Sequence, residues 1–363
     1  ILKALYKGAK ILILDEPTGV LTPQETHDLF RIFSALKQEG VTIILITHKL
    51  REIINITDNV SVMRGGEMVA HRETSKTDRE ELAELMVGRK VLLQVDKGQS
   101  NKGKVLLKIS NLSVCDQQGV YRLQNVSFDV HEGEVVGIAG VSGNGQSTLL
   151  KVLSGITPPT EGSIDILDHV MDTNHQIYPD QLRRYGLAHV PEDRQRMGLI
   201  NDFSASETAI LGYHNSSEIN QGLLLKKDKV KYNCESLMSA FDVRPADPDL
   251  QSRNFSGGNQ QKLILAREFE RNPNILLIGQ PTRGVDIGAI EFIHKRIIGM
   301  RDAGKAVLLV SVELDEIMSL SDRIIVLCDG QITGNIDAKD ADERTLGMMM
   351  ANAYTGEENE TTH

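Results

Sequence analysis

Short apolar runs alternate along the chain with longer stretches in which apolar residues recur every three or four positions. Such runs, rich in Ile, Val and Leu, are typical of buried strands, and the intervening pattern is typical of amphipathic helices. The expected strands are residues 11–14, 42–46, 61–63, 135–138, 187–190, 275–278, 307–310 and 324–327. Strands separated by helices in this way predict an α/β fold with a mainly parallel sheet.

One pattern occurs twice. The segment ILILDEPT at 11–18 returns as ILLIGQPT at 275–282, and the strand region 42–50 returns at 306–314. Both pairs are offset by 264 positions (275 − 11 and 306 − 42), and two segments in one register indicate a duplicated module. Residues 89–104 are polar, contain glycines and have no apolar period, which predicts a linker. We therefore divide the chain into residues 1–88, a linker at 89–104, residues 105–352 and a polar tail at 353–363.

Composition narrows the classes of partner. The chain has 40 Lys and Arg against 50 Asp and Glu, a formal charge of −10, with no basic block for nucleic acid or anionic lipid. The longest apolar runs are far shorter than the ~20 residues of a membrane helix. Three cysteines, Cys115, Cys234 and Cys328, have neither metal-binding spacing nor an even number, which indicates reduced thiols.

Acidic residues and a histidine follow two of the predicted strands. Asp15 and Glu16 follow the strand at 11–14, and His48 follows the strand at 42–47. The carboxyl ends of parallel strands form the ligand-binding edge of an α/β sheet. In a nucleotide site there, Asp15 would hold Mg²⁺ through water, and Glu16 would polarise the attacking water beside His48. The alternatives are an acid pair that caps the next helix and a structural histidine.

A glycine-rich loop joins the strand at 135–138 to a helix predicted at 149–153. Its expected phosphate-binding residues are Gly140, Ser142, Gly143, Asn144, Gly145, Gln146, Ser147 and Thr148. Backbone amides and a helix N-terminus favour an anion, and the Ser147 hydroxyl is a candidate Mg²⁺ ligand. Gln146 stands where such loops carry a lysine, so we expect the loop to bind nucleotide without supporting catalysis. A flexible turn without a ligand is the alternative.

A second phosphate-binding motif is predicted just before the helical run at 262–269. It comprises Ser256, Gly257, Gly258 and Gln260. Small residues at this position expose unpaired N–H groups and the positive end of the helix dipole, which suit a phosphate.

With these motifs the chain resembles the ATP-binding subunits of ABC transporters. Residues 11–16 are similar to the Walker B motif, His48 to the switch histidine, and 255–260 to the signature. The resemblance implies an ABC-type P-loop NTPase fold with a mainly parallel core sheet, a helical subdomain and N-terminal antiparallel strands. It makes residues 1–88 the C-terminal part of one nucleotide-binding domain and 105–352 a second one.

The second domain lacks the groups that hydrolysis needs. Gln146, Gly279, Gln280 and Val312 stand in place of the phosphate-loop lysine, the Mg²⁺ aspartate, the water-activating acid and the switch histidine. The resemblance implies head-to-tail pairing of domains. The competent site would then take Asp15, Glu16 and His48 from the first domain and Ser256, Gly257 and Gly258 from the second. The first domain's own phosphate loop and signature are expected upstream of Ile1, so the chain alone is expected to hydrolyse ATP very poorly.

Further segments point to a branch of this family. Residues 190–194 and 281–286 are similar to importers for simple sugars and nucleosides, and 280–284 with 144–146 resemble the purine-nucleoside branch. The resemblance thus implies an ATP- and Mg²⁺-dependent ATPase that drives nucleoside uptake. A ribose- or galactose-type sugar importer is the alternative, and a soluble ABC protein acting on ribosomes or nucleic acid is the rival class. Implied partners are two membrane permeases and an extracytoplasmic substrate-binding protein, which place the chain at the cytoplasmic face of the membrane.

Three smaller assignments complete the expectations. Glu192 stands where the family carries a γ-phosphate-sensing loop, usually with glutamine, and a salt-bridged surface acid is the alternative. Residues 203–253 are expected to be helical and to dock on the permease. Tyr121, placed ahead of a strand at 125–130, either stacks on adenine or packs as a core aromatic.

Overall fold

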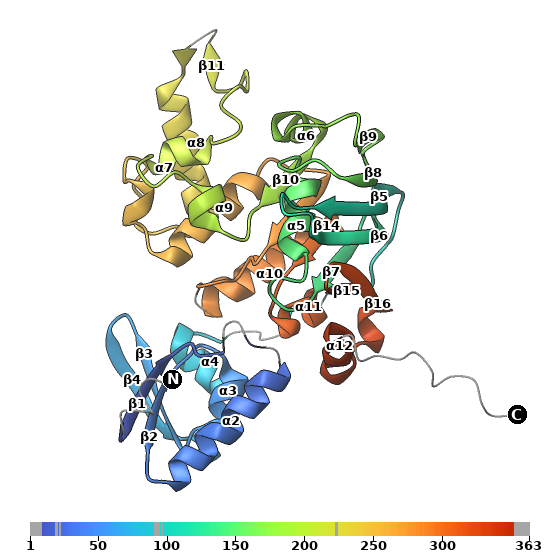
Figure 1. Ribbon diagram of the computed structural model, residues 1–363. Coiled ribbons are helices and arrows are strands. Elements are labelled where there is room, and N and C mark those ends of the chain that lie inside the picture. The colour runs from blue at the N-terminus through green and yellow to red at the C-terminus, as the bar shows by residue number, and fades with distance from the viewer. Residues whose placement is uncertain are drawn as a thin grey trace, which may run out of the picture. The chain divides into compact units, whose positions relative to one another are not determined.

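The computed structural model describes residues 9–18, 21, 23–90, 95, 97–221, 224–285 and 287–351. The chain divides into two compact units, residues 1–95 with 286–292 and residues 96–285 with 293–363 (Figure 1). The division at 95/96 falls inside 89–104, where the described residues form no helix or strand. Within the described chain, no helix is both long and apolar enough to cross a membrane. The tail predicted at 353–363 lies outside the described residues.

The first unit pairs two parallel strands with a covering helix. Its elements are β1 (Ile11–Asp15), α2 (Pro23–Gln38), β2 (Thr42–Ile46), α3 (Leu50–Ile56), β3 (Asn59–Arg64), β4 (Glu67–Glu73), the 3₁₀ turn η1 (Thr74–Lys76) and α4 (Arg79–Val87). β1 and β2 run parallel, and β3 and β4 form an antiparallel pair. Leu12 and Leu14 alternate along β1 and bury one face of that strand with Phe33 of α2.

The second unit is built on a six-stranded sheet in the order β10-β13-β14-β7-β15-β16. Its strands are β7 (Val135–Ala139), β10 (Leu187–Val190), β13 (Ile275–Gly279), β14 (Ala306–Val310), β15 (Arg323–Cys328) and β16 (Gln331–Asp337). All pairs are parallel except β15 with β16. Every residue of β7, β13 and β14 is buried, because a parallel sheet is covered on both faces and needs apolar side chains throughout. The predicted α/β class is confirmed.

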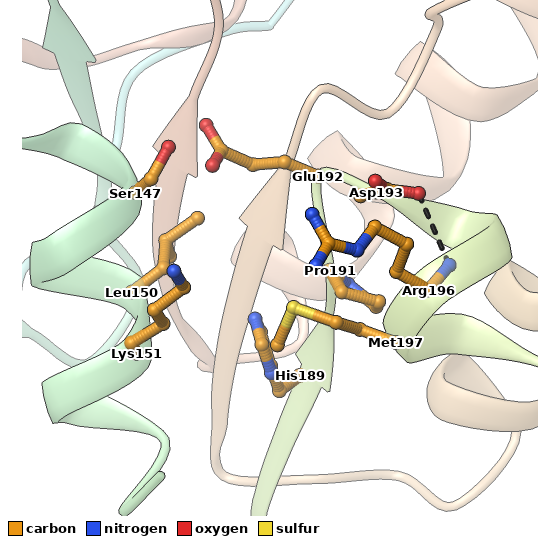
Figure 2. Close-up of a pocket in the computed structure, with 9 residues that line it drawn as sticks. All are labelled: Ser147, Leu150, Lys151, His189, Pro191, Glu192, Asp193, Arg196 and Met197. Carbon is orange, nitrogen blue, oxygen red and sulfur yellow. Dashed lines mark hydrogen bonds between the residues drawn. The ribbon is translucent and has the colours of Figure 1, made fainter. Parts of the chain in front are cut away.

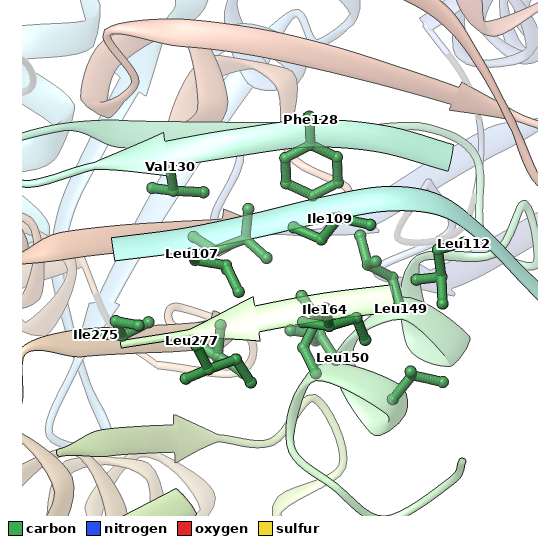
Figure 3. Close-up of a cluster of buried hydrophobic side chains, with 14 of the residues drawn as sticks. Leu107, Ile109, Leu112, Phe128, Val130, Leu149, Leu150, Ile164, Ile275 and Leu277 are labelled. Carbon is green, nitrogen blue, oxygen red and sulfur yellow. The ribbon is translucent and has the colours of Figure 1, made fainter. Parts of the chain in front are cut away.

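An antiparallel sheet, in the order β6-β5-β8-β9, lies in the same unit. Its strands are β5 (Val105–Cys115), β6 (Tyr121–His131), β8 (Glu161–Ile166) and β9 (His169–Asp172). Leu107, Ile109 and Ile164 of this sheet share one core with Leu149 and Leu277 (Figure 3). This sheet contains the antiparallel strands that the resemblance implied.

Helices complete the second unit. They are α5 (Gln146–Leu153), α6 (Pro179–Tyr185), α7 (Ala205–Ala209), α8 (Lys227–Ala240), α9 (Gly257–Phe269), α11 (Leu314–Leu320) and α12 (Glu343–Met350), with the short turns η2 (Arg194–Gly198), η3 (Ser252–Asn254) and η4 (Ala338–Asp340). A further helix, α10 (Ile287–Asp302), has its first residues assigned to the first unit. α7, α8 and α9 pack together in a helical subdomain.

Some predicted boundaries are wrong. The strand expected at 125–130 begins at Tyr121, because β6 pairs with β5 from the Cys115–Tyr121 position onward. The region 203–253 is only partly helical: between α7 and α8 lie turns and the short strands β11 (Asn220–Gln221) and β12 (Leu224–Leu225). Tyr121 is 45% exposed, so it is not a core aromatic.

Candidate functional site

The glycine-rich loop connects β7 to α5, as predicted. Gly145 is the N-cap of α5 with φ of 107°, and a Cβ there would lie 2.8 Å from the backbone oxygen of Arg122. Only glycine satisfies both the left-handed backbone and this close approach. The helix starts at Gln146, three residues earlier than predicted, so Ser147 and Thr148 lie in its first turn. Ser147 is exposed there, where unpaired backbone N–H groups favour a phosphate.

Gln146 is folded back onto its own loop. Its side chain is buried, and Nε2 donates a hydrogen bond of 3.1 Å to the backbone oxygen of Val141. The amide also lies directly against Gly140. The side chain therefore closes the loop from inside and adds no positive charge for phosphates.

The acid pair of the first unit lies where two parallel strands end. β1 finishes at Asp15, and Glu16 takes a left-handed backbone, φ 42°, while its N–H donates to the oxygen of Ile46 on β2 at 2.9 Å. Nδ1 of His48 lies 2.6 Å from Oε1 of Glu16. Asp15 and Glu16 are exposed, and His48 is half-buried. The structure thus joins Glu16 to His48, as their positions after adjacent strands predict.

The corresponding edge of the second unit has the same backbone without the acids. Gln280 follows Gly279 with φ of 50°, and its N–H donates to Val310 at 2.8 Å. In place of a carboxylate–imidazole contact, Oε1 of Gln280 accepts the backbone N–H of Val312 at 3.3 Å. A carboxamide that accepts a hydrogen bond from a backbone N–H cannot act as a general base, so Gln280 cannot activate a water molecule.

The signature forms the first turn of α9 rather than a loop before it. Ser256 caps the helix, and its Oγ accepts hydrogen bonds from the backbone and side-chain nitrogens of Asn259, at 3.4 and 2.9 Å. This cap starts the helix at Gly257, earlier than the predicted 262, because it satisfies one of the first-turn N–H groups. Gln260 is buried, and its Nε2 donates to the oxygen of Ser252 at 2.9 Å. Its side chain therefore fixes the signature to η3 instead of facing solvent.

Arg194, the last residue of the segment 190–194, lies beside the signature, a position that the sequence motifs do not predict. Its Nη1 donates to the backbone oxygen of Arg283 at 2.8 Å, and the guanidinium lies against Gly257. Partial burial, with Arg283 nearby, lowers the pKa of Arg194. Its place in the sequence does not predict this contact, because Arg194 and Arg283 are 89 positions apart.

A pocket of about 310 Å³ lies between α5 and the segment after β10 (Figure 2). Its lining residues are Ser147, Leu150, Lys151, His189, Pro191, Glu192, Asp193, Arg196 and Met197. Burial lowers the pKa of His189 to about 4, so the imidazole is neutral at pH 7. Among the described residues, no three His, Cys, Asp or Glu side chains gather as a metal cluster.

A parallel sheet in which a glycine-rich loop joins a buried strand, β7, to a helix, α5, is the arrangement of a P-loop nucleotide-binding protein. A sequence model of the ABC transporter family matches residues 123–283. The nucleoside import ATP-binding protein NupA of Lactococcus lactis is 44% identical, over 98% of this chain and 70% of its own length. The guanosine import ATP-binding protein NupO of Bacillus subtilis is also 44% identical, over 97% of this chain and 68% of its own.

Two other matches extend the comparison. The glucose import ATP-binding protein TsgD13 of Haloferax volcanii is 44% identical, over 96% of this chain and 64% of its own length. The solved dimeric cassette MJ0796, a bacterial ABC transporter cassette, has a TM-score of 0.55 at 27% identity, over 64% of this chain and 98% of its own. The chain belongs to the ABC transporter family, among the ATP-binding proteins of importers, and it is an ATPase of that family.

Proposed function

We propose that this ATPase powers the import of a purine-type nucleoside, and that hydrolysis uses Asp15, Glu16 and His48. The observation that carries the proposal is the 2.6 Å contact of His48 with Glu16 at the ends of β1 and β2. Glu16 is exposed and can accept a proton from an attacking water, while His48 orients its carboxylate.

The cofactor proposed is Mg²⁺ bound with ATP. Mg²⁺ prefers oxygen ligands, keeps several waters and is held by one or two protein groups plus substrate phosphates. The exposed carboxylate of Asp15 in the first unit and the exposed hydroxyl of Ser147 in the second unit are oxygen donors of this kind, each for a separate nucleotide site. When bound, the ion would neutralise the charge that develops on the phosphates.

We propose that the glycine-rich loop and the signature bind the phosphates of a nucleotide, and that the second unit does not hydrolyse that nucleotide. The first phosphate-binding element is a loop with the N-terminus of α5, formed by Gly140, Ser142, Gly143, Asn144, Gly145, Ser147 and Thr148. The second is the N-terminus of α9, formed by Ser256, Gly257 and Gly258. The amide of Gln146 bonds its own loop, and the unit has Gly279, Gln280 and Val312 at its strand ends. We therefore expect the second unit to bind nucleotide but not to hydrolyse it. Gln260 has the supporting role of holding the signature turn.

The proposed partners are two membrane permeases and an extracytoplasmic binding protein, with the chain at the cytoplasmic face of the membrane. Two relatives carry nucleoside or guanosine in their names and one carries glucose at equal identity, so a sugar importer is the second candidate. The sequence from Gln280 to Gly284 favours the nucleoside branch.

Phosphate release by the reconstituted transporter tests the proposal. The membrane subunits that co-purify with the chain are placed in vesicles, and binding protein loaded with guanosine, ribose or glucose is added. Stimulation by guanosine alone supports nucleoside import. Stimulation by ribose or glucose alone favours the sugar importer, and recovery of the chain with ribosomes instead of membrane subunits overturns both.

A further inference from the structure

The outer end of the helical subdomain exposes large apolar side chains. It is formed by β11, β12 and the first two turns of α8, and Figure 1 shows it at the end of the subdomain away from the six-stranded sheet. Leu224 and Leu225 of β12 are 75% and 45% exposed, and Tyr232 of α8 is 71% exposed. Residues 224–232, called the tip below, therefore present three large apolar side chains to solvent.

The leucines of β12 are not needed to hold the tip in place. Ile219 and Val230 are buried and form a small apolar cluster with Ile210. The backbone N–H of Lys226 donates to the oxygen of Ile219 at 2.8 Å, which ties the start of α8 to the residue before β11. Because these contacts already fix the backbone, the exposed leucines are available to an apolar surrounding outside the chain.

Lysines surround the exposed apolar side chains. The four lysines of the tip are all exposed: Lys226, Lys227, Lys229 and Lys231. Asp228 is the one acid at 224–232, so four lysines against one aspartate give the tip a formal charge of +3 within a chain of −10. Lys231 pairs with Asp249 at 2.7 Å, whereas in the part of the chain that the structure describes the other three lysines form no ion pair. The charge of the whole chain does not reveal this local basic cluster.

An anionic lipid surface fits this combination of side chains better than a protein surface does. Leucine and tyrosine suit the boundary between lipid headgroups and acyl chains. Lysines bury their methylene groups at such a boundary while their ammonium groups reach the anionic headgroups. Protein interfaces, in contrast, are poor in lysine. The exposed apolar area and the surrounding positive charge therefore favour lipid as the occupant.

We propose that the tip binds the anionic headgroups of a membrane and places Leu224 in the apolar boundary below them, so that this ATPase contacts lipid directly. This contact is additional to the proposed function, in which membrane subunits connect the chain to the membrane. Each lysine close to an anionic surface strengthens binding about fivefold. A few such contacts give weak and reversible binding, as expected of a surface that supports a larger contact with membrane subunits.

Flotation of the full chain with protein-free vesicles tests lipid binding. Vesicles of phosphatidylcholine alone are compared with vesicles that also contain phosphatidylglycerol, each at low and at high salt. We expect the chain to float with the anionic vesicles only, and less at high salt, because salt screens the lysines. Equal binding to neutral and anionic vesicles would contradict the role of the lysines.

Two triple variants locate the charge that matters. Changing the three unpaired lysines of the tip together to Gln is expected to weaken binding about 10²-fold, because three favourable charges are lost. The matched control changes three exposed lysines elsewhere to Gln, Lys76, Lys90 and Lys339, and is expected to bind like wild type. Equal loss in the two variants would show that only the net charge of the chain matters, which overturns the assignment of the tip.

A single tryptophan reports which residue enters the membrane, because the chain has no Trp of its own. The emission of Leu224→Trp is expected to shift to the blue on anionic vesicles and to be quenched by lipids with brominated chains. Ile13→Trp is the control, since Ile13 is an exposed apolar residue of β1 in the first unit, and it should show neither change. Quenching of the tryptophan at 13 and not at 224 would place the lipid contact in the first unit and overturn the proposal.

Contact of the tip with protein is a separate outcome. If wild type does not float with protein-free anionic vesicles, and the triple variant of the tip binds the co-purified membrane subunits more weakly, the tip contacts protein and the assignment to lipid is wrong. These measurements involve neither nucleotide binding nor phosphate release, so their failure is distinguishable from failure of the proposed function.

Discussion

The two copies of the repeated module differ in chemistry far more than in backbone. Each strand and helix from β1 to α4 recurs from β13 to α12 at the offset of 264: α2 corresponds to α10, β3 to β15, and β4 to β16. Glu16 and Gln280 both take left-handed backbone, with φ of 42° and 50°. Both hairpins have their bulge at the same step, Val62/Met63 and Val326/Leu327.

A buried hydrogen bond recurs with the same offset. Thr18 donates to Glu52 at 2.5 Å, and Thr282 donates to Glu316 at 2.8 Å, with both glutamates buried. An unpaired buried carboxylate is costly, so this bond maintains the turn after the acid motif in each copy. The second copy therefore keeps the groups that hold the backbone in place, while Gly279, Gln280 and Val312 replace the two acids and the histidine at its strand ends.

The largest expected effect is on phosphate release, and it comes from replacing Glu16, the acid that the second copy lacks. Glu16→Gln is expected to lower single-turnover phosphate release by the assembled transporter about 10²–10⁴-fold, because the carboxylate that accepts the water's proton is lost. The matched change, Gln280→Glu, is expected to add no activity, since Val312 replaces the histidine and Gly279 the aspartate. A quench-flow assay with labelled ATP measures both. Wild-type release by Glu16→Gln, or a gain in Gln280→Glu, contradicts the proposed division of labour.

The two sheets also differ in how their apolar side chains are covered. Ile13 of β1 is 64% exposed, whereas its counterpart Leu277 is fully buried. The same contrast holds between Ile44 and Leu308. In the second unit, residues 105–274 supply strands and helices around β13 and β14, including Leu107, Leu149 and Ile164. Equal sequence patterns thus give unequal stabilisation, because burial depends on what packs against the strand.

The second prediction concerns stability and follows from this difference in burial between β1 and β13. Leu277→Ala is expected to lower the free energy of unfolding of the second unit by about 2–5 kcal/mol, through lost apolar burial and a cavity. The matched change, Ile13→Ala, is expected to cost about 0.5 kcal/mol or less in the first unit. Because the chain has no Trp, urea unfolding is followed by circular dichroism, with hydrogen exchange assigning each transition to a unit. Equal losses in the two variants refute the contrast in burial.

Much of the fold is predictable from the sequence because the strands that carry the site are short, continuous apolar runs. The strands at 42–46 and 187–190 have the predicted limits, and the offset found from two segments extends over every element of the first copy. The antiparallel strands β5, β8 and β9 are less visible, because polar residues interrupt or flank their apolar ones: Lys, Ser and Asn in β5, Glu, Ser and Asp in β8, and His and Asp in β9. Their presence was implied by the resemblance rather than by the pattern.

The site is predictable only where its residues share a loop or follow strands that the sequence pattern already predicts to be neighbours. Glu16 and His48 follow adjacent strands, so their proximity could be expected. Glu192 and Gly279 are 87 positions apart, and their contact depends on β10 lying beside β13, which no local pattern specifies. Helix starts were misplaced for a related reason. Ser256 and Gly145 both act as N-caps, so residues that look like loop belong to the first helical turn.

The smallest expected effect concerns the phosphate loop. Gln146→Lys replaces an amide that bonds Val141 by an ammonium that can reach the outer phosphates. We expect ATP to bind the full chain about tenfold more tightly, or about 1.4 kcal/mol, because one charge-assisted contact is gained. Calorimetry with a non-hydrolysable ATP analogue measures the change, and Gln146→Met, which removes the amide without adding charge, is the control. Phosphate release should not rise, since Gly279, Gln280 and Val312 are unchanged. Tighter binding by Gln146→Met as well would locate the effect in loop opening, and faster release by Gln146→Lys would show that the missing lysine alone had silenced the second unit.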